Sequence, residues 1–340
     1  MNKKKILVIG CGKLAQTIHL PNINKLRFQL KGICDPRKNL LEKVANQYNF
    51  ENYYSDIKTA LKNNYDLIFL FSSRLSSYPI ILKIIKYQKK CTVFCEKPTV
   101  FNLKQSKIIQ KKIKGTKLKL LSAYMSRYDI ALLRFRKIFK SRKFKNKYGV
   151  IKKIECSINN NKLYNKKYKY FRTTEKKDFF YDKNQYPLNL KKKLRNYYHV
   201  FINRYSHLIN IVNFFYRINK IEKFIINDIY NYEAFFKSNE LVHLKFKNKK
   251  NYEIKITIFT KKFRIILILY NPTLLLNSKI LIYKNNKLIY FFKKKTDVFF
   301  EEIKNIFSKN LQSKTKIADL VSDFKIINSL WNKEIIQNNS

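Results

Sequence analysis

Near its start the chain reads Lys5-Ile6-Leu7-Val8-Ile9-Gly10-Cys11-Gly12-Lys13-Leu14-Ala15, an apolar run that breaks into Gly-x-Gly-x-x-Ala and continues with helical spacing. A continuous apolar run is typical of a buried parallel strand. Gly10 allows a tight turn, Gly12 lets backbone N–H groups approach a pyrophosphate, and the small Ala15 lets the next helix pack closely on the strand. The anion then lies at a helix N-terminus, where unpaired N–H groups and the helix dipole favour negative charge. This pattern indicates a dinucleotide-binding turn.

An acidic residue follows the second strand candidate. The run Phe28–Cys34 ends at Asp35, about the distance at which a carboxylate meets the ribose hydroxyls of NAD. Asp35-Pro36 is also a pair of residues that opens turns, and both interpretations stay open on the sequence. Arg37 offers a partner for a 2′-phosphate. The expected cofactor is therefore NAD, with NADP as the alternative.

Apolar strands alternate with helical patterns in the first part of the chain, which predicts βαβ units and a parallel sheet. The expected strands are Lys5–Ile9, Gln29–Cys34, Leu67–Phe71, Thr92–Cys95 and Lys119–Ala123. The expected helices are Asn39–Tyr48, Ile57–Asn63, Pro79–Gln88 and Leu103–Ile113. Such sheets bind ligands at the carboxyl ends of their strands, where Gly10, Asp35, Ser72 and Lys97 all fall.

From about Tyr124 the pattern changes to strands that follow one another without helices, so an open and mostly antiparallel sheet is expected. The expected strands are Ile151–Ile158, Lys223–Ile229, Leu241–Phe246, Tyr252–Thr260, Arg264–Tyr270, Lys279–Tyr283 and Lys287–Phe292. Asn285-Asn286 predicts a hairpin turn, because asparagine tolerates positive φ. A helix over Tyr198–Phe215 should pack on this sheet, and two more helices, within about residues 298–331, close the chain.

These patterns predict an α/β chain of two domains. A Rossmann-type, doubly wound parallel sheet forms residues 1–123, and an α+β domain with an open, mostly antiparallel sheet forms residues 124–340. Residues 160–197 are rich in Lys, Tyr and Asn and only weakly periodic. They are either a loop-rich excursion over the site or a partly disordered insert.

Several motifs together resemble a known family. Gly-x-Gly-x-x-Ala is followed by His19-Leu20-Pro21, by Asp35, and by Glu96-Lys97-Pro98, and the match returns at Tyr205-Ser206-His207-Leu208-Ile209-Asn210. This order resembles the glucose–fructose oxidoreductase / inositol dehydrogenase / rhizopine catabolism (Gfo/Idh/MocA) family of NAD(P)-dependent oxidoreductases. The resemblance is specific over roughly residues 4–130.

The resemblance implies an enzyme that transfers hydride between nicotinamide and a hydroxyl or keto carbon of a sugar, cyclitol or nucleotide-linked sugar. It implies cofactor contacts by Gly10, Gly12, Lys13, Leu14, Asp35, Arg37, Ser72, Ser73, Glu96 and Lys97. The turn Ser72–Tyr78 lacks the Thr-Pro-Asn that the family usually has there, so the transfer of this subsite is the weakest of the set.

Three residues are the predicted catalytic set: Lys97, His207 and Asn203. Hydride transfer needs a general acid/base and a cation near the developing alkoxide. The resemblance gives His207 the first role and Lys97 the second; the alternatives are a structural histidine and a solvated lysine. Asn203 and Asn210 stand where the family often has Asp, and Asn203 shares a helix face with His207. A catalytically silent cofactor- or sugar-binding member is therefore the alternative function.

Substrate contacts are predicted for Lys97, Asn203, His207 and the pair Arg127-Tyr128. The resemblance places an Arg–aromatic pair near the substrate. The alternative for Arg127 is an ordinary exposed arginine at a domain junction.

The charge of the chain is strongly basic, with 73 Lys+Arg against 22 Asp+Glu and a net charge of +51. Such a balance indicates a nucleic-acid or anionic-membrane partner, or else a general bias of composition. Lysines are spread along the whole chain, and Lys, Asn, Ile, Phe and Tyr are enriched together, which favours biased composition. A basic nucleic-acid-binding protein is the third candidate function, and no specific nucleic acid is expected as a partner.

The five cysteines have no disulfide framework and no zinc-ligand spacing, so a reduced, cytoplasmic protein without a metal is expected. No apolar run is long enough to span a membrane. The expected partners are a small sugar-type substrate and further copies of the chain, as a dimer or tetramer formed through the C-terminal sheet.

Overall fold

The structure is a computed structural model and describes residues 3–160, 169–176, 185–187, 190–218, 220–237, 240–308, 312–332 and 336–338. The chain forms two compact units. Unit 1 comprises residues 1–124, 166–185 and 302–321, and unit 2 comprises residues 125–165, 186–301 and 322–340. The expected division into residues 1–123 and 124–340 omits the two later segments that return to unit 1. They return because their backbone and side chains bond to it, as β15 does to β6.

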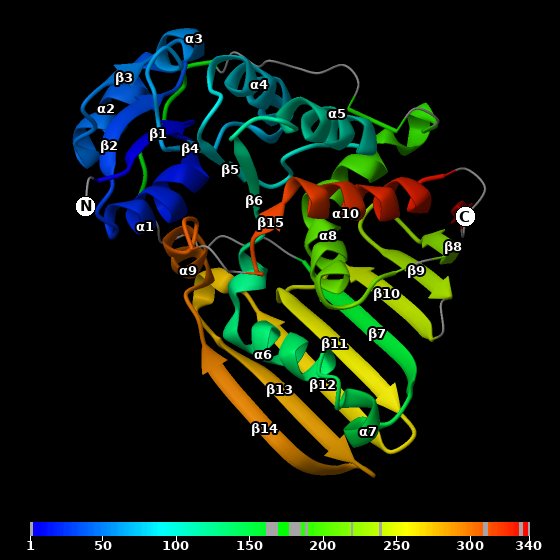
Figure 1. Cartoon of the computed structure of the whole chain (residues 1–340). Helices are drawn as coiled ribbons and strands as arrows, with labels where there is room; N and C mark the ends of the chain where they lie inside the picture. The colour runs from blue at the N-terminus through cyan, green and yellow to red at the C-terminus, as the bar shows by residue number, and fades with distance from the viewer. Residues whose placement is uncertain are drawn as a thin grey trace. The chain divides into compact units, whose positions relative to one another are not determined.

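Unit 1 contains a seven-stranded sheet in the order β3-β2-β1-β4-β5-β6-β15, parallel except for β15 (Figure 1). Its strands are β1 (Lys5–Ile9), β2 (Gln29–Cys34), β3 (Tyr53–Tyr54), β4 (Leu67–Leu70), β5 (Thr92–Glu96), β6 (Lys119–Ala123) and β15 (Thr315–Lys316). The order 3-2-1-4-5-6 is that of the dinucleotide-binding fold, so the expectation of a Rossmann-type sheet is confirmed.

The helices of the same unit follow the strands in sequence. They are the π-helix η1 (Ala15–His19), α1 (Leu20–Asn24), α2 (Lys38–Tyr48), α3 (Ile57–Ala60), α4 (Arg74–Tyr87) and α5 (Leu103–Ile113). The side chains of Asp56 and Asn102 cap α3 and α5. The prediction that α4 begins at Pro79 is wrong, because the helix begins at Arg74 and Pro79 lies inside it. Its first turn is rich in serine and lacks the apolar spacing that predicts a helix.

Unit 2 contains a nine-stranded, mostly antiparallel sheet in the order β14-β13-β12-β11-β7-β10-β9-β8-β16 (Figure 1). Its strands are β7 (Ile151–Asn159), β8 (Lys220–Ile226), β9 (Tyr232–Lys237), β10 (Leu241–Lys247), β11 (Glu253–Thr260), β12 (Phe263–Tyr270), β13 (Asn277–Lys284), β14 (Lys287–Lys295) and β16 (Ile336–Asn338). The hairpin between β13 and β14 turns at Asn285 and Asn286, which have φ of 46° and 66°, so this prediction is confirmed. Strand β9 was not predicted.

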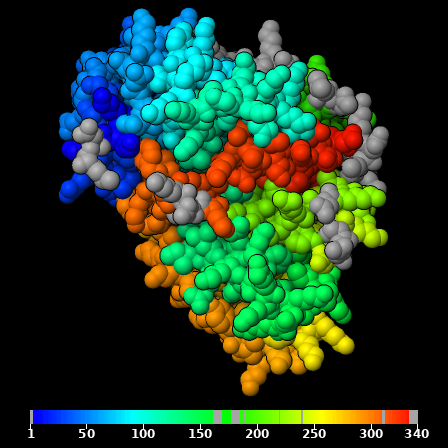
Figure 2. Space-filling model, in the orientation of Figure 1, coloured from blue at the N-terminus to red at the C-terminus, as the bar shows by residue number. Residues whose placement is uncertain are grey.

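Unit 2 also contains helices. They are η2 (Met125–Tyr128), α6 (Ile130–Phe139), α7 (Phe144–Tyr148), η3 (Lys192–Leu194), α8 (Arg195–Phe215) and η4 (Pro272–Leu274). The predicted helix over 198–215 is α8, and its Phe201 contacts Phe246 of β10. Helix α6, which the sequence reading missed, lies across β12–β14 (Figure 1), and Figure 2 shows the outer surface of α6 and α7 beside the edge of that sheet.

Two helices, α9 (Val298–Lys304) and α10 (Ile317–Leu330), close the chain as expected. All five cysteines are buried free thiols, and burial raises their pKa values. Within the described ranges, no helix is long and apolar enough to cross a membrane.

Candidate active site

The glycine turn lies at the point where the strand order of unit 1 reverses, between β1 and β4. Gly10 has a φ of +95°, and its N–H donates to the carbonyl of Cys34 at 2.7 Å. A Cβ at Gly10 would lie 2.7 Å from backbone atoms of Phe71 and Ser72. Glycine is therefore required here by the fold itself, because the turn touches the end of β4.

Gly12 has a different environment. A Cβ there would meet only Nη2 of Arg37, at 4.0 Å, so the space beside this backbone is open. Lys13 is exposed and Leu14 is partly exposed at the start of the helix. The Gly12 carbonyl accepts from the N–H of Gln16, which begins the helical ladder. Close approach to the Gly12 backbone is what a bound pyrophosphate requires, and the contact itself stays a prediction.

Asp35 and Arg37 form a buried ion pair at the end of β2. The guanidinium donates from Nε to Oδ1 and from Nη2 to Oδ2 of Asp35, each at 2.7 Å. Oδ2 also accepts from the N–H of Cys11 at 3.0 Å, which ties the β2 end to the glycine turn. Desolvation acts against ionisation, but the bonds from Arg37 and the N–H of Cys11 hold the pKa of Asp35 below its usual range. Asp35 is thus an ionised carboxylate at the end of β2, and its contact with a ribose stays a prediction.

Ser72 and Ser73 lie between β4 and α4, on the other side of the switch point. The hydroxyls of Ser73 and Ser76 are 2.8 Å apart, and the Ser73 carbonyl accepts from the N–H of Ser76 at 2.9 Å. The serines therefore close the first turn of α4. Their role toward a cofactor stays a prediction.

Glu96, at the end of β5, joins two neighbouring residues of unit 1. Its Oε1 lies 2.8 Å from Nε2 of His19, and its Oε2 accepts from the backbone N–H of Lys97 at 2.8 Å. The His19 ring stacks on Phe71 with centroids 4.0 Å apart. The Lys97–Pro98 peptide bond is cis. Glu96 therefore holds the backbone of the Lys97 turn in place, and His19 holds Glu96.

Lys97 is partly buried. Desolvation, opposed by the charge of Glu96 and aided by that of Arg74, lowers the pKa of Lys97 to about 8. The catalytic role of Lys97 stays a prediction. An ammonium group with this pKa both offers positive charge and exchanges a proton near neutral pH.

Sequence reasoning missed several polar residues of this region. His19 appeared only as part of a motif, and nothing in its sequence position predicts the bond to Glu96. Glu302 is buried, and burial together with the negative charge of Glu96 raises its pKa well above the usual range. Gln16 bonds to Phe171, and Glu175 bonds to Asn39, in both cases across more than 130 sequence positions, so no local pattern predicts either bond. Among the residues that the structure describes, no three His, Cys, Asp or Glu side chains form a metal-binding group.

In unit 2, α8 carries the predicted acid/base. His207 is fully buried, and Asn203, one turn earlier, is partly buried. Tyr128 is buried in η2. Lys97 and His207 belong to different units.

Arg127 is only 1% exposed, so the alternative of an exposed arginine is wrong. Its Nε donates to Oδ1 of Asn210 at 2.8 Å, and Nδ2 of Asn210 donates to Asp323 at 2.6 Å. Asn213 donates to the other oxygen of Asp323 at 2.8 Å. A buried cation and a buried anion are thus joined through α8.

A family model for NAD-binding domains matches the part of the chain that contains the glycine turn. The model of the Gfo/Idh/MocA family, an oxidoreductase family with an NAD-binding Rossmann fold, matches residues 4–124. No curated protein matches the sequence.

Solved structures share the fold at low sequence identity. KijD10 from Actinomadura kijaniata, a 3-ketoreductase in complex with TDP-benzene and NADP, has a TM-score of 0.74 at 12% identity over 99% of both chains. The dehydrogenase MviM from Clostridium difficile has a TM-score of 0.65 at 19% identity, over 96% of this chain and 100% of that one. The WlbA dehydrogenase from Bordetella pertussis, in complex with NADH and UDP-GlcNAcA, has a TM-score of 0.67 at 13% identity, over 97% and 96%.

The glycine turn and the family match define an NAD-binding Rossmann domain of an oxidoreductase family. Residues 4–124 match the Gfo/Idh/MocA family of oxidoreductases, which confirms the resemblance over this part of the chain and agrees with the prediction of an NAD-type cofactor.

Proposed function

We propose that the protein transfers hydride between nicotinamide and a hydroxyl or keto carbon of a nucleotide-linked sugar. The observation that carries this proposal is the open backbone at Gly12, beside the carboxylate of Asp35, at the switch point of the sheet. The substrate class is supported by the ligands named for two proteins of the same fold, TDP-benzene in KijD10 and UDP-GlcNAcA in WlbA. Simple sugars and cyclitols are the wider class.

Lys97 has the electrostatic role in this proposal. When bound, the nicotinamide supplies or accepts the hydride. The Lys97 ammonium group stabilises the negative charge that develops on the reacting oxygen, and its lowered pKa lets it pass a proton at near-neutral pH. Glu96 positions this lysine through its backbone N–H.

His207 has the acid/base role and Asn203 is its positioning partner. The two side chains lie on one face of α8, four residues apart. An amide oxygen accepts a ring N–H without adding charge, so the imidazolium is stabilised less than by an aspartate. Tyr128 is kept as a predicted substrate contact. Arg127 donates to Asn210, and we assign it to the positioning of α8.

The test is an NAD(P)H absorbance assay with a panel of keto- and hydroxy-sugars, free and nucleotide-linked. Wild-type protein should turn over at least one nucleotide-linked sugar. His207→Ala should lower kcat by about 10²–10⁴-fold and leave the Kd for NADH unchanged. His199→Ala is the matched control, because His199 lies on the same helix and is partly buried.

Two outcomes would contradict the proposal. A wild-type protein that binds NADH but oxidises or reduces no sugar is the silent binding protein. Near-normal turnover in the His207→Ala variant would remove the acid/base assignment and leave Lys97 as the proton carrier.

A further inference from the structure

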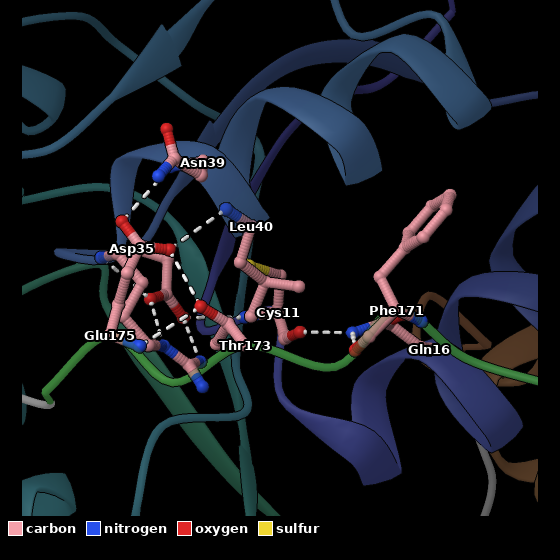
Figure 3. A network of polar contacts seen from close by, with 9 residues as sticks. Cys11, Gln16, Asp35, Asn39, Leu40, Phe171, Thr173 and Glu175 are labelled. Atoms are coloured by element: carbon pink, nitrogen blue, oxygen red, sulfur yellow. Dashed lines mark hydrogen bonds and ion pairs between the residues drawn. The ribbon is translucent and has the colours of Figure 1, made fainter.

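A segment distant in sequence lies along the cofactor turns of unit 1. Phe171 donates its N–H to Oε1 of Gln16 at 2.8 Å, and its carbonyl accepts from Nε2 of Gln16 at 3.3 Å (Figure 3). The same Nε2 donates to the carbonyl of Cys11 at 2.8 Å. Nζ of Lys13 lies 5.0 Å from the centroid of the Tyr170 ring. The segment 169–176, which we term the strap, is therefore fixed to the glycine turn.

The strap ends on the first turn of α2. The Glu175 carboxylate accepts from the N–H of Asn39 at 3.1 Å and from the N–H of Leu40 at 3.2 Å (Figure 3). The Thr173 hydroxyl donates to the same carboxylate at 2.9 Å and accepts from the N–H of Glu175 at 3.1 Å. Helix α2 has no acidic residue in its own first turn and no side-chain cap at Arg37. Glu175 supplies both the cap and the negative charge that a helix N-terminus favours.

The positive charge at this turn, that of Arg37, is also paired with a carboxylate. Both nitrogens of Arg37 that bond to Asp35 do so at 2.7 Å, in a bidentate pair that is almost fully buried. A 2′-phosphate on the adenine ribose is held in this fold by an arginine near the end of β2 and by helix N-termini. In this chain Asp35 already pairs with the arginine, and Glu175 already caps the helix N-terminus.

We propose that Glu175 is a specificity-determining residue that holds the position of a 2′-phosphate at the start of α2 and so selects NAD(H) over NADP(H). This inference rests on the proposed function, since it takes the open backbone at Gly12 to bind a nicotinamide dinucleotide. A phosphate brought to this turn meets the carboxylates of Glu175 and Asp35 instead of free N–H groups and a free guanidinium. NADPH binding therefore requires the strap to give up its bonds to α2, whereas NADH binding does not.

The test measures the Kd of NADH and of NADPH by nicotinamide fluorescence, without substrate. Wild-type protein should bind NADH at least about tenfold more tightly than NADPH. Glu175→Gln should tighten NADPH binding by about tenfold, or roughly 1.4 kcal/mol, because one carboxylate no longer repels the phosphate, and should change the NADH Kd by less than about twofold. Thr173→Val, which removes the hydroxyl that bonds to the carboxylate and to the backbone N–H of Glu175, should shift NADPH binding in the same direction by less. Glu42→Gln is the matched control, because Glu42 is an exposed carboxylate on α2 itself.

Thermal melts of each variant show whether it is folded. An unchanged NADPH Kd in both folded Glu175→Gln and Thr173→Val, or equal affinities of the wild-type protein for the two cofactors, would overturn the assignment of Glu175. Failure of the wild-type protein to bind either cofactor would reject the dinucleotide site itself, and with it the proposed function.

Discussion

Asn210 lies between a buried cation, Arg127, and a buried anion, Asp323, and it satisfies both. Its amide oxygen accepts from the guanidinium while its amide nitrogen donates to the carboxylate. An aspartate has no such donor, so it would place two carboxylates together in the interior of unit 2. The Asn at 210, which departs from the family pattern, is explained by the Asp at 323.

Asn210→Asp should therefore lower the free energy of unfolding by about 2–3 kcal/mol. Urea denaturation measures it. The double variant Asn210→Asp/Asp323→Asn exchanges donor and acceptor and should recover most of the loss. Equal stability of the single variant and the wild type would show that the two side chains are not coupled.

Lys97 gives a dependence of stability on pH. In the unfolded chain a lysine keeps its proton up to its ordinary pKa of 10.5, whereas in the fold the pKa of Lys97 is about 8. Between these values the unfolded state binds more protons, so stability rises with pH across the window. The difference in unfolding free energy between wild type and Lys97→Met should shift in favour of the wild type from pH 7 to pH 9.5, as followed by urea denaturation. A constant difference would contradict the lowered pKa.

At the scale of elements, the β1–η1 turn carries two glycines with different duties. Gly10 has a positive φ, and a Cβ on it would lie 2.7 Å from backbone atoms. A Cβ on Gly12 would meet nothing nearer than 4.0 Å. Gly10→Ala should destabilise the fold by about 3 kcal/mol or more. Gly12→Ala should melt like the wild type and bind NADH at least about tenfold more weakly, because its methyl group fills the space a pyrophosphate needs. Thermal melts and fluorescence titration separate the two, and the reverse pattern would reject this division.

How far the sequence predicts an element depends on whether its signal is local. Strands β1, β2 and β6 and helix α5 have the predicted bounds, because apolar runs or helical periods are flanked by polar residues. Helix α6 and strand β9 were missed. Strand β9 (Tyr232–Lys237) is short and aromatic-rich, and its place is set by pairing with β8 and β10.

The candidate site likewise contains residues that local sequence patterns predict and residues that they do not. The glycine turn and Asp35 follow from residues close together in sequence, and the structure brings them together. The bonds of Glu96 to His19 and of Glu175 to α2 join residues 77 and about 136 positions apart. Such pairs are fixed by tertiary packing, so no spacing along the chain predicts them.

At the scale of the whole molecule, the net charge of +51 attracts polyanions. If this charge reflects biased composition, DNA binding should be independent of sequence and should weaken on the order of a thousandfold between 50 and 200 mM salt, through counterion release. Fluorescence anisotropy with two oligonucleotides of equal length and different sequence measures this. Selective binding that persists at the higher salt would instead support the nucleic-acid-binding function.

Alkylation of the five buried thiols can measure how often each part of the protein unfolds. Alkylating reagents attack the thiolate, and burial both hides each sulfur and suppresses its ionisation. Labelling therefore proceeds through transient exposure of the interior. Cys11, Cys34, Cys91 and Cys95 lie in unit 1 and Cys156 lies in unit 2. Peptide mass spectrometry after timed iodoacetamide pulses would thus give a separate unfolding rate for each unit, without any engineered cysteine.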